Sequence, residues 1–113
     1  MLNDSPALDR AFAALADPVR RGMLARLAKG PASVSELASP LPISLPAVLQ
    51  HLKALESSGL VASKKKGRVR TVRMQADALG VAEDWLSRRR KELEAQLDRF
   101  ENYVATLKTK GEE

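Results

Sequence analysis

The segment SLPAVLQHLKALESSGLV, residues 44–61, carries polar side chains at a spacing suited to contacting nucleic acid. At 100° per residue, Pro46, Gln50 and Lys53 lie on one side of a helix. The opposite side carries the apolar residues Val48, Leu52 and Leu55. A glutamine amide can form two hydrogen bonds with an adenine edge, and a lysine can bind phosphate. The polar residues are therefore either ordinary solvent contacts or the base-reading face of a recognition helix.

Three other residues of this segment flank the polar face. Leu45 and Leu49 lie beside the apolar face, where they could touch a thymine methyl group, although partial core is the interpretation we favour. His51 lies off the apolar face, and a lone histidine is weak evidence for catalysis or metal binding. We interpret His51 as structural or phosphate-facing.

The basic excess of the chain lies in one strip directly after this segment. Residues 60–76 have six basic and no acidic side chains, residues 1–59 have six and five, and residues 77–113 have seven and nine. The strip alternates weakly and has Gly67 in the middle of its charge run, which predicts a β-hairpin with Lys and Arg at its tip. A solvated charge run is the alternative, but a position after a helix-turn-helix pattern favours phosphate binding.

Start and stop signals predict the helices that position these residues. Apolar residues from Leu8 to Leu15, Phe12 among them, mark a first amphipathic helix. Asp17 as N-cap and Pro18 at the first helical position begin a second helix, which Gly30-Pro31 ends.

Two further helices follow. Ser33 and Glu36 form a capping box for a third helix, which Pro40 must end. After a turn, Ser44 begins the fourth helix, and Gly59 caps its C-terminus. Two short helices joined by a tight turn and followed by a basic hairpin predict a winged helix-turn-helix.

An apolar stripe runs through the last third of the sequence. It consists of Leu86, Leu93, Leu97, Phe100, Val104 and Leu107. The spacings of 7, 4, 3, 4 and 3 residues match a heptad a/d seam, with Arg90 at the a position in the first gap. A helix from about Ala78 to Lys108 exceeds what a small core can cover, so we expect much of the stripe to bury against a second copy. A clasp over the first helix, with Trp85 and Phe12 at the junction, is an alternative that could hold at the same time.

Composition narrows the class of protein. A length of 113 residues fits one domain, and the absence of cysteine excludes disulfides and thiolate metal sites. The start MLNDSPALDR lacks the basic residues and apolar run of a signal peptide, and no stretch is apolar enough to span a bilayer. No nucleophile–base pair, carboxylate pair or phosphate-cradling loop indicates an enzyme. We expect a cytoplasmic protein that is not an enzyme and does not contact membranes.

The predicted fold class is mainly α (α+β). It is a winged helix-turn-helix with a two-stranded β wing and a long C-terminal dimerisation helix. We assign residues 1–113 to a single domain, with the helices, helix-turn-helix and wing in residues 7–76, the dimerisation helix in 77–108 and a tail in 109–113.

Four stretches together resemble the ArsR-type, or arsenic-repressor-like, winged-helix transcriptional regulators. They are ALADPVRRGMLARL, SVSELA, ISLPAVLQHLKALESSGLV and GRVRTVRM, and the resemblance covers roughly residues 8–107. It implies a homodimer paired through the first helix, with Leu8 and Phe12, and the last helix. This dimer would bind a pseudo-palindromic operator in double-stranded DNA and usually repress. By position, the resemblance implies DNA contacts from Ser44, Leu45, Pro46, Ala47, Gln50, His51, Lys66, Arg68 and Arg70.

The sequence departs from the metal-sensing members of this family. Those members have cysteines in the helix that here reads SVSELAS, or sets of Asp, His and Glu in the last helix, and this sequence has neither. Asp84 and Glu92 could in principle bind a hard cation, but without a histidine in the last helix the usual zinc or nickel set cannot form. We expect no cofactor and no metal, and the sequence does not identify an inducer.

A winged helix can also serve as a protein-binding adaptor that does not bind DNA specifically. The heptad stripe could then recruit a different partner, whereas the basic hairpin argues for DNA. The preferred prediction is a sequence-specific DNA-binding transcriptional regulator, with repression as the expected outcome.

Overall fold

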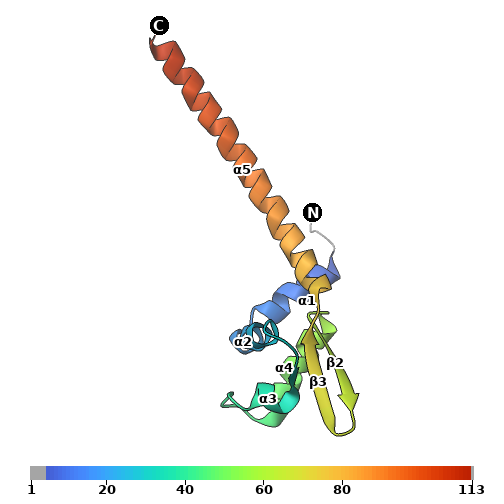
Figure 1. The fold of residues 1–113 in the computed structure, drawn as a ribbon. Helices are drawn as coiled ribbons and strands as arrows, with labels where there is room; N and C mark the ends of the chain where they lie inside the picture. Colours follow the sequence, from blue (N-terminus) through green and yellow to red (C-terminus); the bar gives the residue numbers. More distant parts are fainter. Residues whose placement is uncertain (1–4, 113) are drawn as a thin grey trace. The chain divides into compact units, whose positions relative to one another are not determined.

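The computed structural model describes residues 5–112, in which helices and strands follow one another as a winged helix-turn-helix (Figure 1). The elements are α1 (Pro6–Leu15), α2 (Pro18–Leu27), β1 (Ala32–Ser33), α3 (Val34–Ala38), α4 (Leu45–Ser57), β2 (Val61–Lys66), β3 (Val69–Met74) and α5 (Ala76–Glu112). The backbone divides into two compact units, one up to Ala82 and one from Glu83. The predicted fold class is confirmed.

Polar side chains cap the helices where the sequence predicts. Asp17 Oδ1 accepts the amide of Val19 at 2.8 Å at the start of α2, and Ser44 Oγ accepts the amide of Ala47 at 3.3 Å at the start of α4. The first two positions of α1, α2 and α4 include a proline, which removes only an amide that has no partner in the helix. The predicted capping box of Ser33 and Glu36 begins α3, with both reciprocal bonds at 3.1 Å.

Two arginines of α2 close the C-terminal end of α1. Arg20 donates from Nε to the carbonyl of Ala14 at 2.8 Å and from Nη2 to the carbonyl of Ala13 at 3.0 Å. Arg21 donates from Nη1 to the carbonyl of Leu15 at 2.8 Å. The last carbonyls of a helix lack amide partners from a following turn, and cationic side chains can take that place. The arginines therefore fix the connection between α1 and α2.

Helix α4 ends in the glycine cap that the sequence predicts. Gly59 has φ +80°, its amide donates to the carbonyl of Glu56 at 3.1 Å, and the amide of Leu60 donates to the carbonyl of Leu55 at 3.0 Å. This pair of bonds is the Schellman motif, in which a left-handed residue just after the helix is usually glycine. Leu60 is fully buried, so the cap also directs the chain into the sheet.

The sheet has three strands where the sequence predicts two. β2 and β3 form the antiparallel hairpin, with Val61 opposite Met74 and Lys66 opposite Val69. The short strand β1 then pairs with the other edge of β3, with Ala32 opposite Val72. The third strand, β1, forms because it includes Ser33, the N-cap residue of α3. An N-cap residue has extended backbone, here φ −75° and ψ 161°, and can pair with a strand.

We call β2, β3 and the turn between them the wing. Its turn consists of Gly67 and Arg68, with Gly67 at φ +63°. A two-residue hairpin loop needs positive φ at its first or both central positions, which glycine adopts without steric cost. The hairpin tip predicted at Gly67 is confirmed.

The core of the first unit lies between the helices and the sheet. Its most deeply buried large side chains are Leu55, Leu60, Val48 and Val72. They come from α4, from the residue just before β2 and from β3, so the apolar face of α4 packs against the sheet. This packing leaves the opposite face of α4 in solvent.

Helix α5 is longer than the sequence predicts. It begins at Ala76 rather than Ala78 and continues to Glu112 rather than Lys108. Residues 109–112, assigned to a tail, are therefore helical, because they contain no proline and a glycine near a helix end weakens a helix only slightly. Glu113 lies outside the described residues. No described helix is long and apolar enough to cross a membrane.

Candidate nucleic-acid interface

The solvent-facing side of α4 holds most of the residues predicted to contact DNA. Ser44, Pro46, Gln50 and Lys53 are exposed, and Ala47 is half-buried. Among the described residues, the side chains of Gln50 and Lys53 take part in no hydrogen bond or ion pair. Both can therefore turn toward a ligand. The face predicted from helical periodicity is confirmed as an exposed one.

The interpretation of Leu45 and Leu49 as partial core is wrong. Their side chains are 55% and 46% exposed, because Val48, Leu52 and Leu55 already fill the contact between α4 and the sheet. A hollow remains between α4, the start of α3 and the wing. It is lined by Ser33, Val34, Ser35, Leu45, Leu49, Arg68, Val69 and Arg70.

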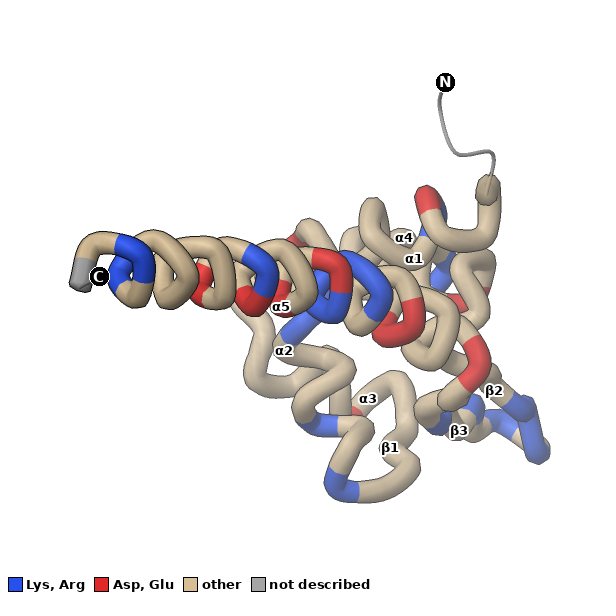
Figure 2. The backbone as a smooth tube through the Cα atoms, turned by 90° about the horizontal axis from the view of Figure 1, so that it is seen from above, with Lys and Arg blue, Asp and Glu red and all other residues tan. Residues whose placement is uncertain are grey.

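The wing carries the cations predicted to bind phosphate. Lys66 and Arg68 are exposed at its tip. Arg70 is exposed too, and its Nη1 donates to Ser63 Oγ at 2.9 Å, whose hydroxyl donates to Glu56 Oε1 of α4 at 2.7 Å. This chain of bonds holds one arginine of the wing beside α4. Figure 2 shows the Lys and Arg positions gathered on β2, β3 and their turn.

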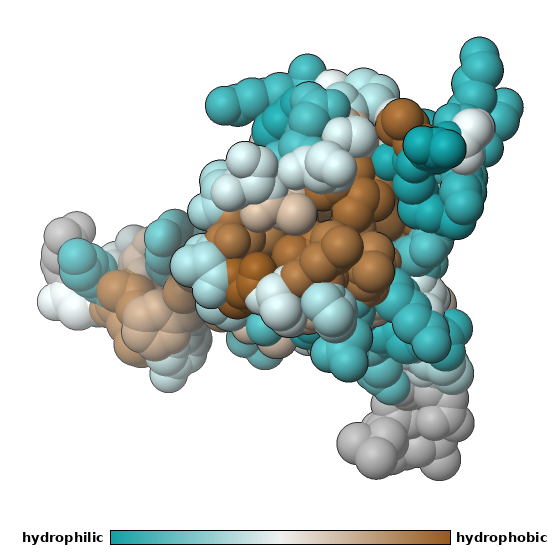
Figure 3. Space-filling view, turned by 90° about the horizontal axis from the view of Figure 1, so that it is seen from below, coloured by the Kyte–Doolittle hydropathy of each residue, from teal (hydrophilic) through white to brown (hydrophobic). Residues whose placement is uncertain are grey.

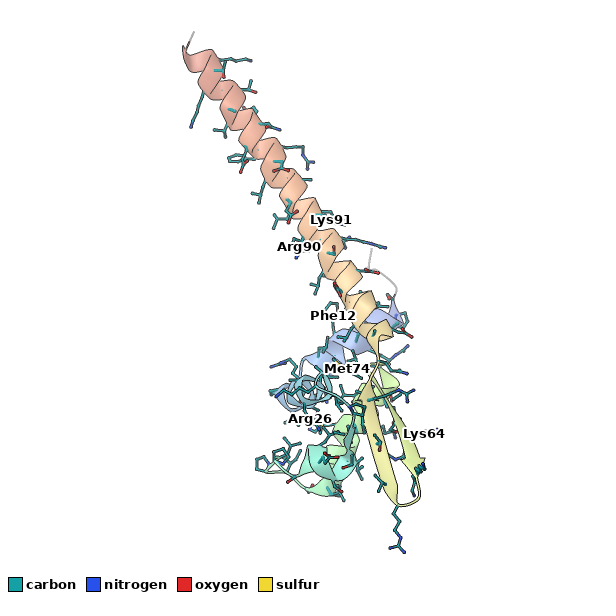
Figure 4. All side chains as sticks on the ribbon, in the orientation of Figure 1. Phe12, Arg26, Lys64, Met74, Arg90 and Lys91 are labelled. Carbon is teal, nitrogen blue, oxygen red and sulfur yellow. The ribbon has the colours of Figure 1, made fainter. Side chains whose placement is uncertain are left out.

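The wing exposes further residues besides the three predicted to contact DNA. Lys64, Lys65 and Arg73 are also exposed on β2 and β3, and Figure 4 shows Lys64 on the outer edge of the hairpin. Val69 is 53% exposed at the start of β3. The charge count of the strip includes the three cations, whereas no signal in the sequence indicates that Val69 is exposed.

His51 lies on the side of α4 that contacts α2, apart from Gln50 and Lys53. Its Nδ1 is 3.3 Å from Arg20 Nη1 and 3.9 Å from Asp17 Oδ1, and its side chain is 21% exposed. Because a guanidinium can only donate, the shorter contact requires Nδ1 to accept and places the ring proton on Nε2. The structure thus favours the structural interpretation of His51 over contact with phosphate.

Asp17 connects this contact to the start of α2. The amide of Arg20, which donates to Oδ1 at 3.1 Å, lowers the pKa of Asp17 below its ordinary value, and the amide of Val19 and the charge of Arg20 add to this effect. The same chemistry recurs at α3, where the amide and hydroxyl of Ser33 lower the pKa of Glu36. Both carboxylates are therefore ionised caps at neutral pH.

The predicted dimer residues of α5 are exposed in the single chain. We call Leu86, Leu93, Leu97, Phe100, Val104 and Leu107 the α5 stripe. Its members are between 49% and 63% exposed, except for Val104, which is half-buried. Tyr103, which lies outside the a and d positions of the heptad, is 62% exposed beside the stripe.

The surroundings of the α5 stripe are charged with both signs. Arg89 pairs with Glu92 at 2.9 Å and Arg90 with Glu94 at 3.8 Å, and the guanidinium of Arg89 lies 5.1 Å from the ring centre of Trp85. Figure 4 shows Arg90 on this helix.

The predicted dimer residues of α1 differ from those of α5. Leu8 is only 8% exposed and Phe12 is half-buried, so Leu8 offers little surface to a second chain.

Acidic and histidine side chains do not gather into a metal site in the described part of the chain. Among residues 5–112, no group of three or more His, Asp or Glu side chains could hold a metal ion, and Asp84 and Glu92 form no such group.

Known proteins similar to this chain are helix-turn-helix regulators. Residues 15–64 match the helix-turn-helix domain family. The chain is 46% identical over 92 residues to the HTH-type transcriptional regulator Rv2034 of Mycobacterium tuberculosis, over 81% of this chain and 76% of that protein. This relative, the solved structure of the regulator RHA00566 and that of the Mb0332 domain are described as regulators or DNA-binding domains. None of the three is described as an enzyme.

Those two solved structures share the fold. The ArsR family transcriptional regulator RHA00566 is 41% identical, with a TM-score of 0.78 over 83% of this chain and 97% of that chain. The winged helix-turn-helix DNA-binding domain Mb0332 of Mycobacterium bovis, described as homodimeric, is 25% identical, with a TM-score of 0.60 over 84% of this chain and 95% of that chain.

Proposed function

Because the chain belongs to the ArsR family of helix-turn-helix transcriptional regulators, we propose that it binds an inverted-repeat operator as a homodimer and represses transcription there. The family makes it a DNA-binding regulator. The operator symmetry, the dimer, the sign of regulation and the contacting residues are the proposal.

One observation carries this proposal: the exposed face of α4 and the cationic wing belong to one compact unit, and Leu45 and Leu49 of α4 line the same hollow as Arg68 and Arg70 of the wing. Gln50 would read a base edge in the major groove, where a glutamine pairs best with adenine. Lys53 and the wing residues Lys66, Arg68 and Arg70 would bind phosphates and fix the position of α4 on the duplex.

The α5 stripe supports the homodimer. Burial of several large side chains that are about half exposed would stabilise a pair of α5 helices, since a heptad seam packs knobs into holes along its whole length. The description of the Mb0332 domain as homodimeric supports a homodimer, without indicating which surface pairs. Leu8 would contribute little, whereas Phe12 could take part.

A twofold dimer sets the geometry of the operator. Two recognition helices related by a twofold axis enter successive major grooves on one side of the duplex, so the half-sites should be inverted and about 10 base pairs apart, or a multiple of that, centre to centre. In the proposed mechanism, the bound dimer excludes RNA polymerase from the promoter.

Selection of bound duplexes from a random library tests this function. We expect the full chain to enrich an inverted repeat and to lose affinity steeply as salt rises, because phosphate contacts release counterions. An adaptor that does not bind DNA specifically predicts no enriched sequence. Failure to enrich any duplex while the protein is folded and dimeric would contradict the proposal.

A further inference from the structure

Three large apolar side chains lie exposed between the recognition helix and the wing. Leu45, Leu49 and Val69 are 55%, 46% and 53% exposed and line one hollow. We call them the apolar strip. Figure 3 shows apolar surface gathered on the face seen from below, with hydrophilic residues beside it. The base and phosphate contacts proposed above use only the polar neighbours of this strip and leave it without a role.

The charges around the strip indicate what could cover it. Arg68 and Arg70 line the same hollow, and the wing has no acidic residue. The nearest acidic group on α4, Glu56, is already bonded to Ser63. An apolar peptide would leave these cations without counter-charges, whereas duplex DNA supplies phosphates beside an edge that leucine can contact.

Only one base presents an apolar group in the major groove. Thymine has a C5-methyl group there, while the other edges present donors and acceptors that a leucine would desolvate without bonding. We propose that the apolar strip is a second specificity determinant, which selects thymine through van der Waals contact between Leu45, Leu49 and the C5-methyl groups. This inference rests on the proposed function.

The spacing of the two leucines suits neighbouring bases. Residues four apart on a helix have Cβ atoms about 5–6 Å apart, and successive bases of one strand are about 3.4 Å apart. Leu45 and Leu49 can therefore reach two thymines that are either adjacent or separated by one intervening base. With Gln50 reading an adenine, each half-site should contain a short A·T segment. Val69 would cover the wing side of the contact and exclude water.

Replacement of thymine by deoxyuridine tests the proposal without altering the protein. The probe is the best duplex from the random selection, with each thymine replaced in turn, which removes one methyl group and keeps every hydrogen bond. We expect one or two positions per half-site to lose about fourfold in affinity, and about 15-fold when both half-sites are changed, as burial of one methyl-sized group predicts. Positions outside the A·T segment should lose nothing.

Protein variants then assign the effect to the strip. At the thymine that Leu49 contacts, Leu49→Ala should bind the thymine and deoxyuridine duplexes equally, whereas Leu49→Met, which keeps an apolar contact, and Gln50→Ala should retain the difference. Equal binding of all deoxyuridine duplexes by the wild-type chain would overturn the proposal and leave the proposed function standing. A deoxyuridine effect that persists at the same position in both Leu45→Ala and Leu49→Ala would also overturn it. Failure to enrich any duplex would overturn both the proposed function and this inference.

Discussion

Two surfaces of the chain leave large apolar side chains in solvent, and they differ in the charges around them. The apolar strip on α4 and β3 lies beside a strip of chain, residues 60–76, with six basic and no acidic side chains, and the acid of α4, Glu56, is hydrogen-bonded to Ser63. The α5 stripe lies among both signs, with Arg89 and Arg90 paired to Glu92 and Glu94. Figure 2 shows the same contrast between the wing and α5.

The difference indicates which partner each surface can bind. Two copies of a surface with a large excess of one sign of charge repel each other, so the α4 and wing surface suits a polyanion. A surface with both signs can pair with its own copy under twofold symmetry, because a cation of one chain can face an acid of the other. The exposed apolar area alone would not distinguish the α4 and wing surface from the α5 stripe, because both expose large apolar side chains.

The largest expected effect comes from a charge in the α5 stripe. Leu97→Asp would bury an unpaired carboxylate in the seam and should yield monomer or unfolded chain, with loss of operator binding. Arg99→Asp, two residues away and about 200° around the helix, is the matched control and should stay dimeric. Light scattering at micromolar concentration measures both variants. A monomeric wild type, or a dimeric Leu97→Asp variant, would contradict the assignment of this stripe.

The next effect separates base reading from phosphate binding on the other surface. Gln50→Ala should cost roughly 1–3 kcal/mol on the best operator and much less on random DNA, because alanine cannot bond a base edge. Arg68→Ala should instead weaken all sequences alike and reduce the salt slope by about 0.9 for each phosphate that is no longer neutralised, counted over both subunits. Binding titrations at several salt concentrations measure both. The reverse pattern would place the wing in a groove and α4 on the backbone.

A smaller effect concerns the contact beneath α4. The pKa of Asp17 is lowered in the folded chain, so its stabilising contribution is present at neutral pH and is lost as pH falls from about 5 through the folded-state pKa. Asp17→Asn keeps a capping oxygen but cannot ionise. At pH 7 the wild type should melt a few degrees higher, and this difference in Tm should shrink toward pH 3. A difference that is constant with pH would mean that the charge of Asp17 adds nothing.

The smallest expected effect is that of metals. Neither surface offers a metal-binding group within residues 5–112, and the sequence has no cysteine. Zinc, nickel and arsenite at stoichiometric concentration should leave an operator complex intact in a fluorescence anisotropy measurement, and peroxide should act only through slow methionine oxidation. Release of DNA by one of these ions, without precipitation of the protein, would show a ligand set that both sequence and structure fail to indicate.

Local signals explain what the sequence predicts well. The caps at Asp17, Ser33 and Ser44 and the glycine cap at Gly59 depend on residues within a few positions of each other, so a short window contains all the information. The exposed face of α4 follows from helical periodicity for the same reason. Strand β1 is not predicted because two residues are too few to show an alternating pattern.

Features that depend on distant residues are not predictable in this way. Leu45 and Leu49 are exposed because the wing leaves a hollow beside α4, and the position of the wing depends on how the whole core packs. His51 is separated from Arg20 by 31 residues, so no local pattern indicates their contact. The family resemblance implies a position near DNA for His51, whereas its closest polar contacts lie on α2 and its N-cap.

The arginine contacts between α2 and α1 have a consequence for the order of folding. Arg20 and Arg21 reach carbonyls only six or seven residues back along the chain, so little loop-closure entropy opposes these contacts. The pairing of Ala32 with Val72 must instead close a loop of about forty residues. Contacts of short sequence separation form fastest, so we expect the α1–α2 hairpin to be structured in the folding transition state and the edge of the sheet to form late. The side of the hollow that Ser33 of β1 lines would then be completed after the side formed by α4 and the wing, whose bonds through Ser63 span only seven residues each.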